Sequence, residues 1–159
     1  MLNRNFEVLT VNGPLDLTAK DIYAGTPLTL TDKGYKKATN ATAFVGLSFN
    51  YFSPEKDDVM GGEWFANSGK VGVVKIGQVT IDKDVFEGKE PVYPYDSTKT
   101  YKVGDKLFVN AAGLITNEAA AAAEGNINFV GTVTVAPGQA TEVYGISDTA
   151  MIVFVNASL

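Results

Sequence analysis

The sequence has no cysteine and no histidine among its 159 residues. Without cysteine, the chain can form neither disulfide bonds nor thiolate zinc sites. Without histidine, it lacks the commonest general base and the commonest metal ligand, and a Ser-His-Asp triad is excluded. These two absences remove many familiar catalytic and metal-binding designs, so we predict no catalytic residue, no metal and no cofactor.

Positive charge is also scarce, with 13 lysine and arginine residues against 18 aspartate and glutamate residues. Nucleic-acid-binding domains usually carry a basic patch, and this sequence has no cluster of lysine and arginine. No stretch approaches 18 apolar residues, and the N-terminal segment lacks the apolar run of a secretory signal. The sequence therefore predicts neither a nucleic-acid partner nor a membrane-spanning segment.

Short apolar segments separated by glycine and proline turns dominate the rest of the chain. This spacing predicts an all-β barrel or sandwich built from short glycine-turned hairpins. One segment, NEAAAAAEG at 117–125, is expected to form either a short alanine-rich helix, capped by Asn117 and ended by Gly125, or an ordered loop. We expect residues 1–17 to form an N-terminal arm and residues 18–159 a single β-rich domain.

A glycine-bounded pattern occurs twice, 79 residues apart. The matched pairs are Ile22 and Tyr101, Gly25 and Gly104, Leu28 and Leu107, Leu30 and Val109, and Gly34 and Gly113. Both copies then reach the tripeptide FVG, whose glycine lies 12 residues after the second glycine in the first copy and 18 in the second. The pattern predicts duplicated halves at about 18–82 and 96–156, and the alternative is two ordinary hairpins of one barrel.

The matched positions are small or apolar, so the repeat indicates a scaffold rather than a site. Because side chains alternate along a strand, Leu28 and Leu30 are both expected to face a core. An acidic segment at 55–63 contains Glu55, Asp57, Asp58 and Glu63. It fits a solvated loop, a weak cation site or an acid/base pair, although the alternating calcium-loop pattern is absent.

Two sets of apolar side chains are candidates for contacts with other proteins. The first set consists of aromatic residues, which fit a core, a subunit interface or a ligand platform: Tyr51, Phe52, Trp64, Phe65, Tyr93 and Tyr95. The second set lies in the arm, and its members are Phe6, Val8, Leu9 and Val11. An extended arm of this kind either adds a strand to a partner's sheet or forms the first strand of its own barrel.

Lines such as VGDKLFVNAAGLIT and FVGTVTVAP, in a small acidic chain, resemble the capsid decoration (cement) proteins of tailed bacteriophages. The similarity covers roughly residues 22–155 and is clearer in the second half. It implies a non-enzymatic β-rich protein that forms a homotrimer and binds the major capsid protein on the outer surface of the virion. Such a protein is made in the host cytoplasm, and its arm reaches onto the capsid.

A second hypothesis is a carbohydrate- or receptor-binding β module of a phage head or tail fibre. It predicts glycan binding that depends on Trp64. A third hypothesis, an enzyme that uses carboxylates alone, would rest on Asp57 and Glu63. The decoration protein is the hypothesis that the sequence favours.

Overall fold

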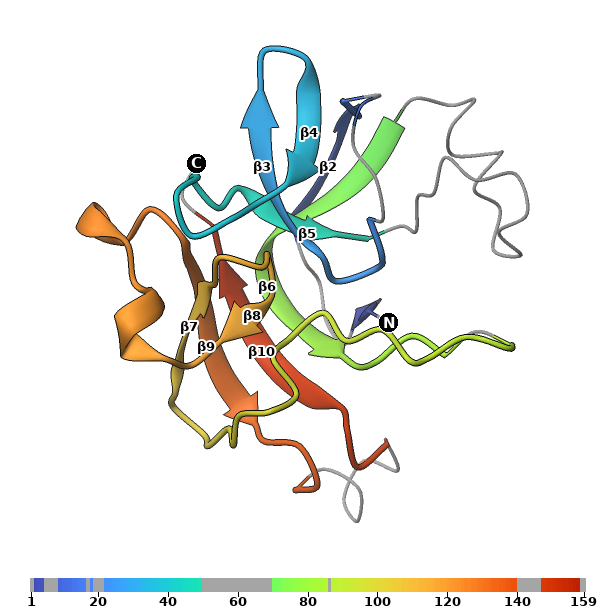
Figure 1. Cartoon of the computed structure of the whole chain (residues 1–159), viewed down its shortest axis with the longest axis vertical. Coiled ribbons are helices and arrows are strands. Elements are labelled where there is room, and N and C mark those ends of the chain that lie inside the picture. The colour runs from blue at the N-terminus through green and yellow to red at the C-terminus, as the bar shows by residue number, and fades with distance from the viewer. Residues whose placement is uncertain are drawn as a thin grey trace.

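The computed structural model describes residues 2–4, 9–16, 18, 22–49, 70–85, 87–139 and 147–157. The regular structure of these residues is almost entirely β-strand, which confirms the predicted all-β class (Figure 1). The strands are β1 Leu2–Arg4, β2 Leu9–Pro14, β3 Pro27–Thr31, β4 Gly34–Lys37, β5 Gly46–Ser48, β6 Lys70–Ile81, β7 Lys106–Val109, β8 Ile115–Thr116, β9 Phe129–Val135 and β10 Met151–Asn156.

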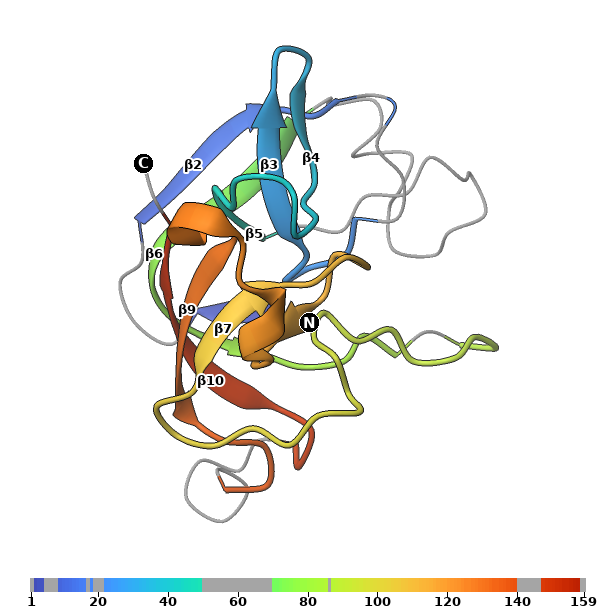
Figure 2. The ribbon, with the colours of Figure 1, turned by 60° about the vertical axis from the view of Figure 1, so that its left-hand side comes forward.

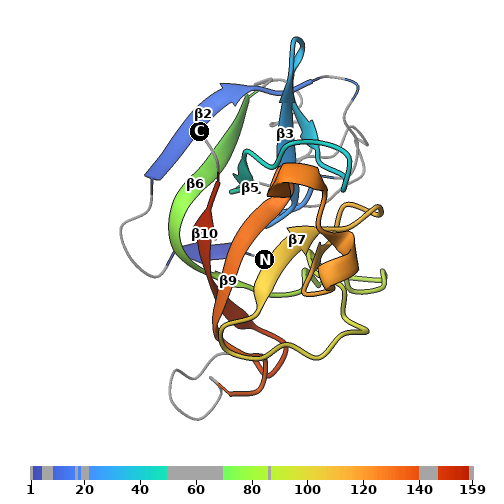
Figure 3. The same ribbon diagram turned by 90° about the vertical axis from the view of Figure 1, so that its left-hand side faces the viewer.

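The long strand β6 joins the two parts of the sheet. Its first part pairs with β2 and β5, and its last part pairs with β1 and β10, all antiparallel. Figure 3 shows β2 lying along β6, which curves through the molecule. The described strands of the N-terminal arm, β1 and β2, therefore belong to the chain's own sheet and do not extend away from it towards a partner.

Strand order is the same in both directions from the β6–β10 pair. On one side the order is β6, β5, β3 and β4, and on the other it is β10, β9, β7 and β8. In each direction a hairpin, β3–β4 or β7–β8, is followed along the chain by a strand that pairs back onto it. The two halves of the sheet therefore have one topology.

Matching hydrogen bonds extend this correspondence to individual atoms. In the first half, the Gly25 N–H donates to the Ser48 carbonyl at 2.7 Å. In the second half, the Gly104 N–H donates to the Val133 carbonyl at 2.8 Å. Gly25 and Gly104 have φ angles of 91° and 89°, in the left-handed region where glycine is favoured. The repeated glycine thus makes the same turn into β3 and into β7.

The apolar side chains form two clusters. The smaller cluster lies in the first half and contains Leu15, Ile22, Leu28, Tyr35, Val71 and Val73. The larger cluster is centred on β9, β10 and the end of β6, and it also receives Phe44 and Leu47 from the first half. The two halves are therefore linked both by apolar contact and by the pairing of β6 with β10.

The prediction for the β3 leucines is right for Leu28 and wrong for Leu30. Leu28 is fully buried, but 52% of Leu30 is exposed. Leu30 lies near the tip of the β3–β4 hairpin, which projects from the sheet (Figure 2). Its counterpart Val109 is fully buried. The two copies differ because only the second has the longer connection, which lies against β7 through residues 119–121.

Of the two predicted alternatives, the alanine-rich segment takes the ordered loop and not the capped helix. It contains two separate 3₁₀ turns, η1 Ala119–Ala121 and η2 Glu124–Asn126. Asn117 does not cap the first turn, because its side chain donates instead to the Thr100 carbonyl and to an Asp105 carboxylate oxygen, each at 2.8 Å. Tertiary hydrogen bonds have therefore overridden a helix propensity that is marginal at this length.

Asn128 fixes the end of this connection. Its side chain is fully buried and donates to the carbonyls of Val109 and Ala121 at 2.8 and 2.7 Å. Its side-chain oxygen accepts from the Ala123 N–H at 2.9 Å. One amide side chain thus holds the connection onto β7. No helix among the described residues is long and apolar enough to cross a membrane.

Candidate binding site

The segment Pro94–Thr98 leads the chain into the second half. The Asp96 carboxylate accepts hydrogen bonds from the Thr98 N–H at 3.0 Å and from the Thr98 hydroxyl at 2.6 Å. The Asp96 N–H donates to the Ile115 carbonyl at 2.8 Å, which fastens the segment to β8. The hydroxyl hydrogen bond from Thr98 lowers the pKa of Asp96, because it stabilises the ionised carboxylate.

The same segment begins the first half, where it runs from Pro14 to Thr18. Asp16 accepts from the Thr18 N–H and hydroxyl at 2.9 and 2.7 Å, and its own N–H donates to the Tyr35 carbonyl at 2.9 Å. This Pro-x-Asp-x-Thr pattern is visible twice in the sequence, but its two copies are not aligned by the shift of 79 residues that aligns the glycines. One residue fewer lies between its threonine and the next glycine in the second copy.

Three tyrosines cluster beside the second of these segments. The rings of Tyr93 and Tyr95, and those of Tyr95 and Tyr101, meet edge to face with centroids 5.5 Å apart in both pairs. This is a favourable geometry for aromatic pairs. Leu15 and Ile22 stand at the positions of Tyr95 and Tyr101 in the first half, so the tyrosine cluster is specific to the second half.

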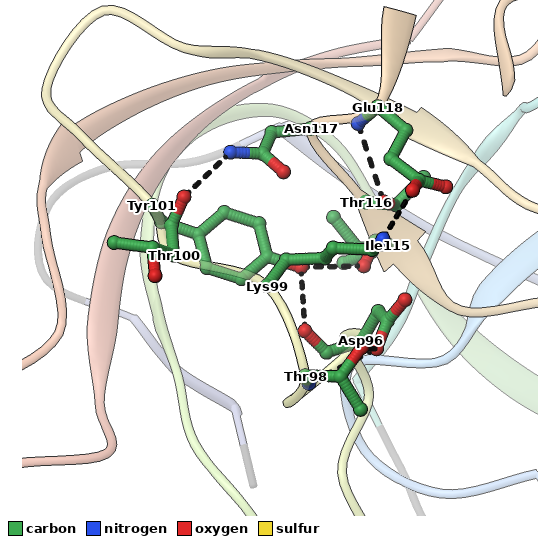
Figure 4. A network of polar contacts seen from close by, with 9 residues as sticks. All are labelled: Asp96, Thr98, Lys99, Thr100, Tyr101, Ile115, Thr116, Asn117 and Glu118. Carbon is green, nitrogen blue, oxygen red and sulfur yellow. Dashed lines mark hydrogen bonds and ion pairs between the residues drawn. The ribbon is translucent and has the colours of Figure 1, made fainter. Parts of the chain in front are cut away.

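The hydroxyl groups of the two buried tyrosines are bonded to the backbone. The Tyr101 hydroxyl donates to the Asp96 carbonyl at 2.9 Å and lies 3.1 Å from the Ile115 carbonyl (Figure 4). The Tyr95 hydroxyl donates to the Thr149 carbonyl at 2.5 Å. Burial raises the pKa of both phenols, and nearby carboxylates add to the effect. Both phenols are therefore protonated at neutral pH and serve as donors, not as bases.

A cavity of about 280 Å³ opens beside these tyrosines. Its walls carry the three tyrosines, three hydroxyl side chains and two charged groups: Tyr93, Tyr95, Tyr101, Ser97, Thr100, Thr149, Lys99 and Asp148, with Pro137 completing the lining. The volume is close to the lower end of the range for small-ligand sites, and the mixture of aromatic and polar groups is typical of them. This cavity is the strongest candidate binding site among the described residues.

Polar contacts brace both sides of the cavity. Lys99 forms an ion pair with Glu118, which ties the tyrosine segment to the start of the alanine-rich connection (Figure 4). On another side, the Thr149 hydroxyl donates to the buried Asp82 carboxylate at 2.6 Å, which ties the segment before β10 to the end of β6. The cavity walls are thus fixed to the alanine-rich connection at one point and to the end of β6 at another.

The structure gives the positions of only some of the predicted contact residues. Tyr93 and Tyr95 both line the cavity, with Tyr95 only 4% exposed. In the arm, 49% of Leu9 is exposed, whereas Val11 packs partly against the smaller apolar cluster. The other candidates lie outside the described residues, as does the acidic segment 55–63, and they are Phe6, Val8, Tyr51, Phe52, Trp64 and Phe65.

The two described groups of predicted residues are thus separate features, one at the cavity and one on β2. Sequence reasoning included Tyr93 and Tyr95 but missed Lys99, Tyr101 and Asp148 as lining residues. Among the described residues, no group of three or more acidic side chains is placed to hold a metal ion. No protein-family model, curated protein or solved structure matches the chain.

Proposed function

We propose that the chain is a virion structural protein that binds the outside of a phage capsid lattice and stabilises it. The observation that carries the proposal is the doubled topology of the sheet, in which one hairpin unit is built twice around the β6–β10 pair. A capsid presents the same surface many times, and a body with two similarly built halves is suited to contact two such surfaces at once.

The expected mechanism is physical rather than chemical. When two or more weak contacts form together, the second benefits from a high effective concentration, and the combined affinity exceeds that of either contact. Assembly as a homotrimer would multiply the contacts again and bridge neighbouring capsid subunits against the outward pressure of packaged DNA. The net charge of −5 would keep the free protein soluble and away from nucleic acid.

Among the arm residues that the structure describes, Leu9 is the best candidate for a capsid contact, because its side chain is exposed. It lies at the start of β2, opposite Ile76 of β6, where about half of its side chain is open to a partner. Burying an exposed leucine at an interface contributes roughly 1.5–3 kcal/mol at most. Because only about half of the Leu9 side chain is open to a partner, replacing it with serine should weaken capsid binding by at most roughly tenfold, without unfolding the protein.

Co-sedimentation with expanded empty capsids of the virus that carries the gene tests the proposal. Wild-type protein should pellet with the capsids and saturate at a fixed ratio to the capsid subunit. Leu9→Ser should pellet less, while the matched control Val103→Ser, at a residue that is 57% exposed in the turn before β7, should pellet like wild type. Failure of the wild-type protein to pellet would overturn the proposal.

The proposed trimer has an independent test in light scattering. A homotrimer would have three times the chain mass of 16.9 kDa, and a monomer would remove the trimer from the proposal. We do not advance the carbohydrate-binding module as a second function. The residue on which that hypothesis depends, Trp64, lies outside the described residues, and no contact among the described residues favours glycan binding.

A further inference from the structure

The cavity beside the tyrosines combines aromatic walls with an exposed carboxylate. Tyr93, Tyr95 and Tyr101 form one side through successive edge-to-face contacts, with interplanar angles of 77° and 84°. Asp148 is the acidic group in the lining, and it is exposed. An aromatic ring attracts a cation through the negative charge of its face, and a carboxylate beside the ring adds to that attraction.

The charges behind the walls have the same sign. Asp82 and Asp148 both act on the Tyr95 phenol, and their negative charge helps burial to raise its pKa. Asp96 and Glu118 act on Tyr101 in the same direction. Lys99 is the one cation among the lining residues, and its ammonium group is paired with Glu118. The potential inside the cavity should therefore be negative.

The two buried phenol groups of the cavity do not favour an anionic ligand. The hydroxyl protons of Tyr95 and Tyr101 are directed to backbone carbonyls, so they are not available to bind a carboxylate or phosphate. A cation needs no donor from the protein, because it requires only acceptors and ring faces. The Tyr93 ring is only partly buried and is the ring most open to such a ligand.

We propose that this cavity binds a basic side chain, lysine or arginine, presented by the partner protein. The volume of about 280 Å³ is large enough for one such side chain and too small for a folded element. The inference rests on the proposed function for the identity of the partner, which would be the capsid subunit. The aromatic wall belongs to the second half, because Leu15 and Ile22 stand in the first half in place of the two buried tyrosines.

Small probes test the cavity without any capsid. Nα-acetyl-arginine amide and Nα-acetyl-lysine amide carry the two candidate cations, and Nα-acetyl-citrulline amide is the neutral control. In a titration followed by two-dimensional NMR, the charged probes should shift signals of residues 93–101 and 148–149, while citrulline should not. The stronger of the two charged probes identifies the preferred side chain.

A pair of matched variants locates the charge that matters. Asp148→Asn should weaken binding of the charged probe about three- to fivefold, as expected for loss of one exposed ion pair. Asp32→Asn removes the same charge from the exposed β3–β4 turn and should leave binding unchanged. Tyr93→Leu should weaken binding further while leaving the buried hydrogen bonds of Tyr95 and Tyr101 in place.

The inference is overturned if neither charged probe shifts these signals, if citrulline binds equally well, or if Asp148→Asn binds like wild type. Failure here is distinguishable from failure of the proposed function, because the probe titration contains no capsid. If the probes bind but the wild-type protein does not pellet with capsids, the cation site stands and the capsid role falls. If Asp148→Asn pellets like wild type, the cavity does not contact the capsid.

Discussion

Replacing Gly131 with alanine should push β9 away from β10, its neighbour in the second half of the sheet. Gly131 pairs with Leu107 of β7 on one side and with Val155 of β10 on the other. A Cβ at this position would overlap the Phe154 carbonyl and lie 3.2 Å from the Val155 Cα. These are backbone atoms and cannot rotate away, so β9 must move off β10.

The size of this effect can be separated from the general cost of losing a glycine. Gly104→Ala provides the comparison, because Gly104 has φ 89° but no atom within 4 Å of an added Cβ. An L-residue held in the left-handed region costs about 1–2 kcal/mol. Overpacking typically costs about 1–3 kcal/mol and occasionally more. Since the obstacle at Gly131 is a rigid strand, we expect a loss of at least about 3 kcal/mol there.

Urea unfolding followed by circular dichroism measures both variants. With an m value of about 2 kcal/mol/M, the expected losses lower the urea midpoint by about 1.5 M for Gly131→Ala and by about 0.5–1 M for Gly104→Ala. Gly46→Ala should behave like Gly131→Ala, because its Cβ would meet the Val74 carbonyl of β6 in the same way. The packing argument fails if Gly131→Ala costs no more than Gly104→Ala.

Three further predictions concern the connection and the turns. Asn128→Ala should lower the free energy of unfolding by about 2–3 kcal/mol in urea titrations, because it leaves buried backbone groups without hydrogen-bond partners. A loss below about 0.5 kcal/mol would contradict these hydrogen bonds. In the same titrations, Val109→Ala should lower the free energy of unfolding by about 2–3 kcal/mol and Leu30→Ala by less than about 0.5 kcal/mol. Equal losses would show that both side chains are buried. Thr98→Val should destabilise the protein at pH 7, and the loss should become progressively smaller below about pH 4. The folded pKa of Asp96 lies below its ordinary value of 3.8. The stability that the Thr98 hydroxyl gives by bonding the carboxylate is therefore complete above the unfolded pKa of Asp96 and is lost as the pH falls through its folded pKa. A pH-independent difference between Thr98→Val and wild type would refute the last prediction.

The sequence was sufficient for the fold class because strand periodicity and glycine turns are local signals. The turns at Gly25 and Gly104 and the burial of Leu28 follow from such signals. The exposure of Leu30 does not, because it depends on whether another segment covers the hairpin. The choice between a helix and an ordered loop at 117–125 has a similar origin, because Asn117 has tertiary hydrogen-bond partners that no local pattern reveals.

The candidate site was less predictable than the fold for a related reason. Tyr93 and Tyr95 could be selected as aromatic residues in a turn-rich segment, but Asp148 lies far along the chain and reaches the cavity through the fold. Tyr101 belongs to the repeat, whose matched positions predict a scaffold rather than a site. A polar residue that replaces an apolar one between two copies of a repeat is a signal in the sequence, although it shows only that the environments differ.

Comparison of the two halves indicates where a partner would distinguish them. Features that both halves share, such as the aspartate turns and the paired glycines, maintain the backbone and are explained by its folding. The differences are the tyrosines in place of Leu15 and Ile22, and the connection that covers Val109 but has no equivalent over Leu30. If the chain binds a repeating lattice, the common backbone places two similar surfaces against it. The differing side chains then make the two contacts chemically unequal, with the proposed cation-binding cavity on one half and a hairpin that exposes Leu30 on the other.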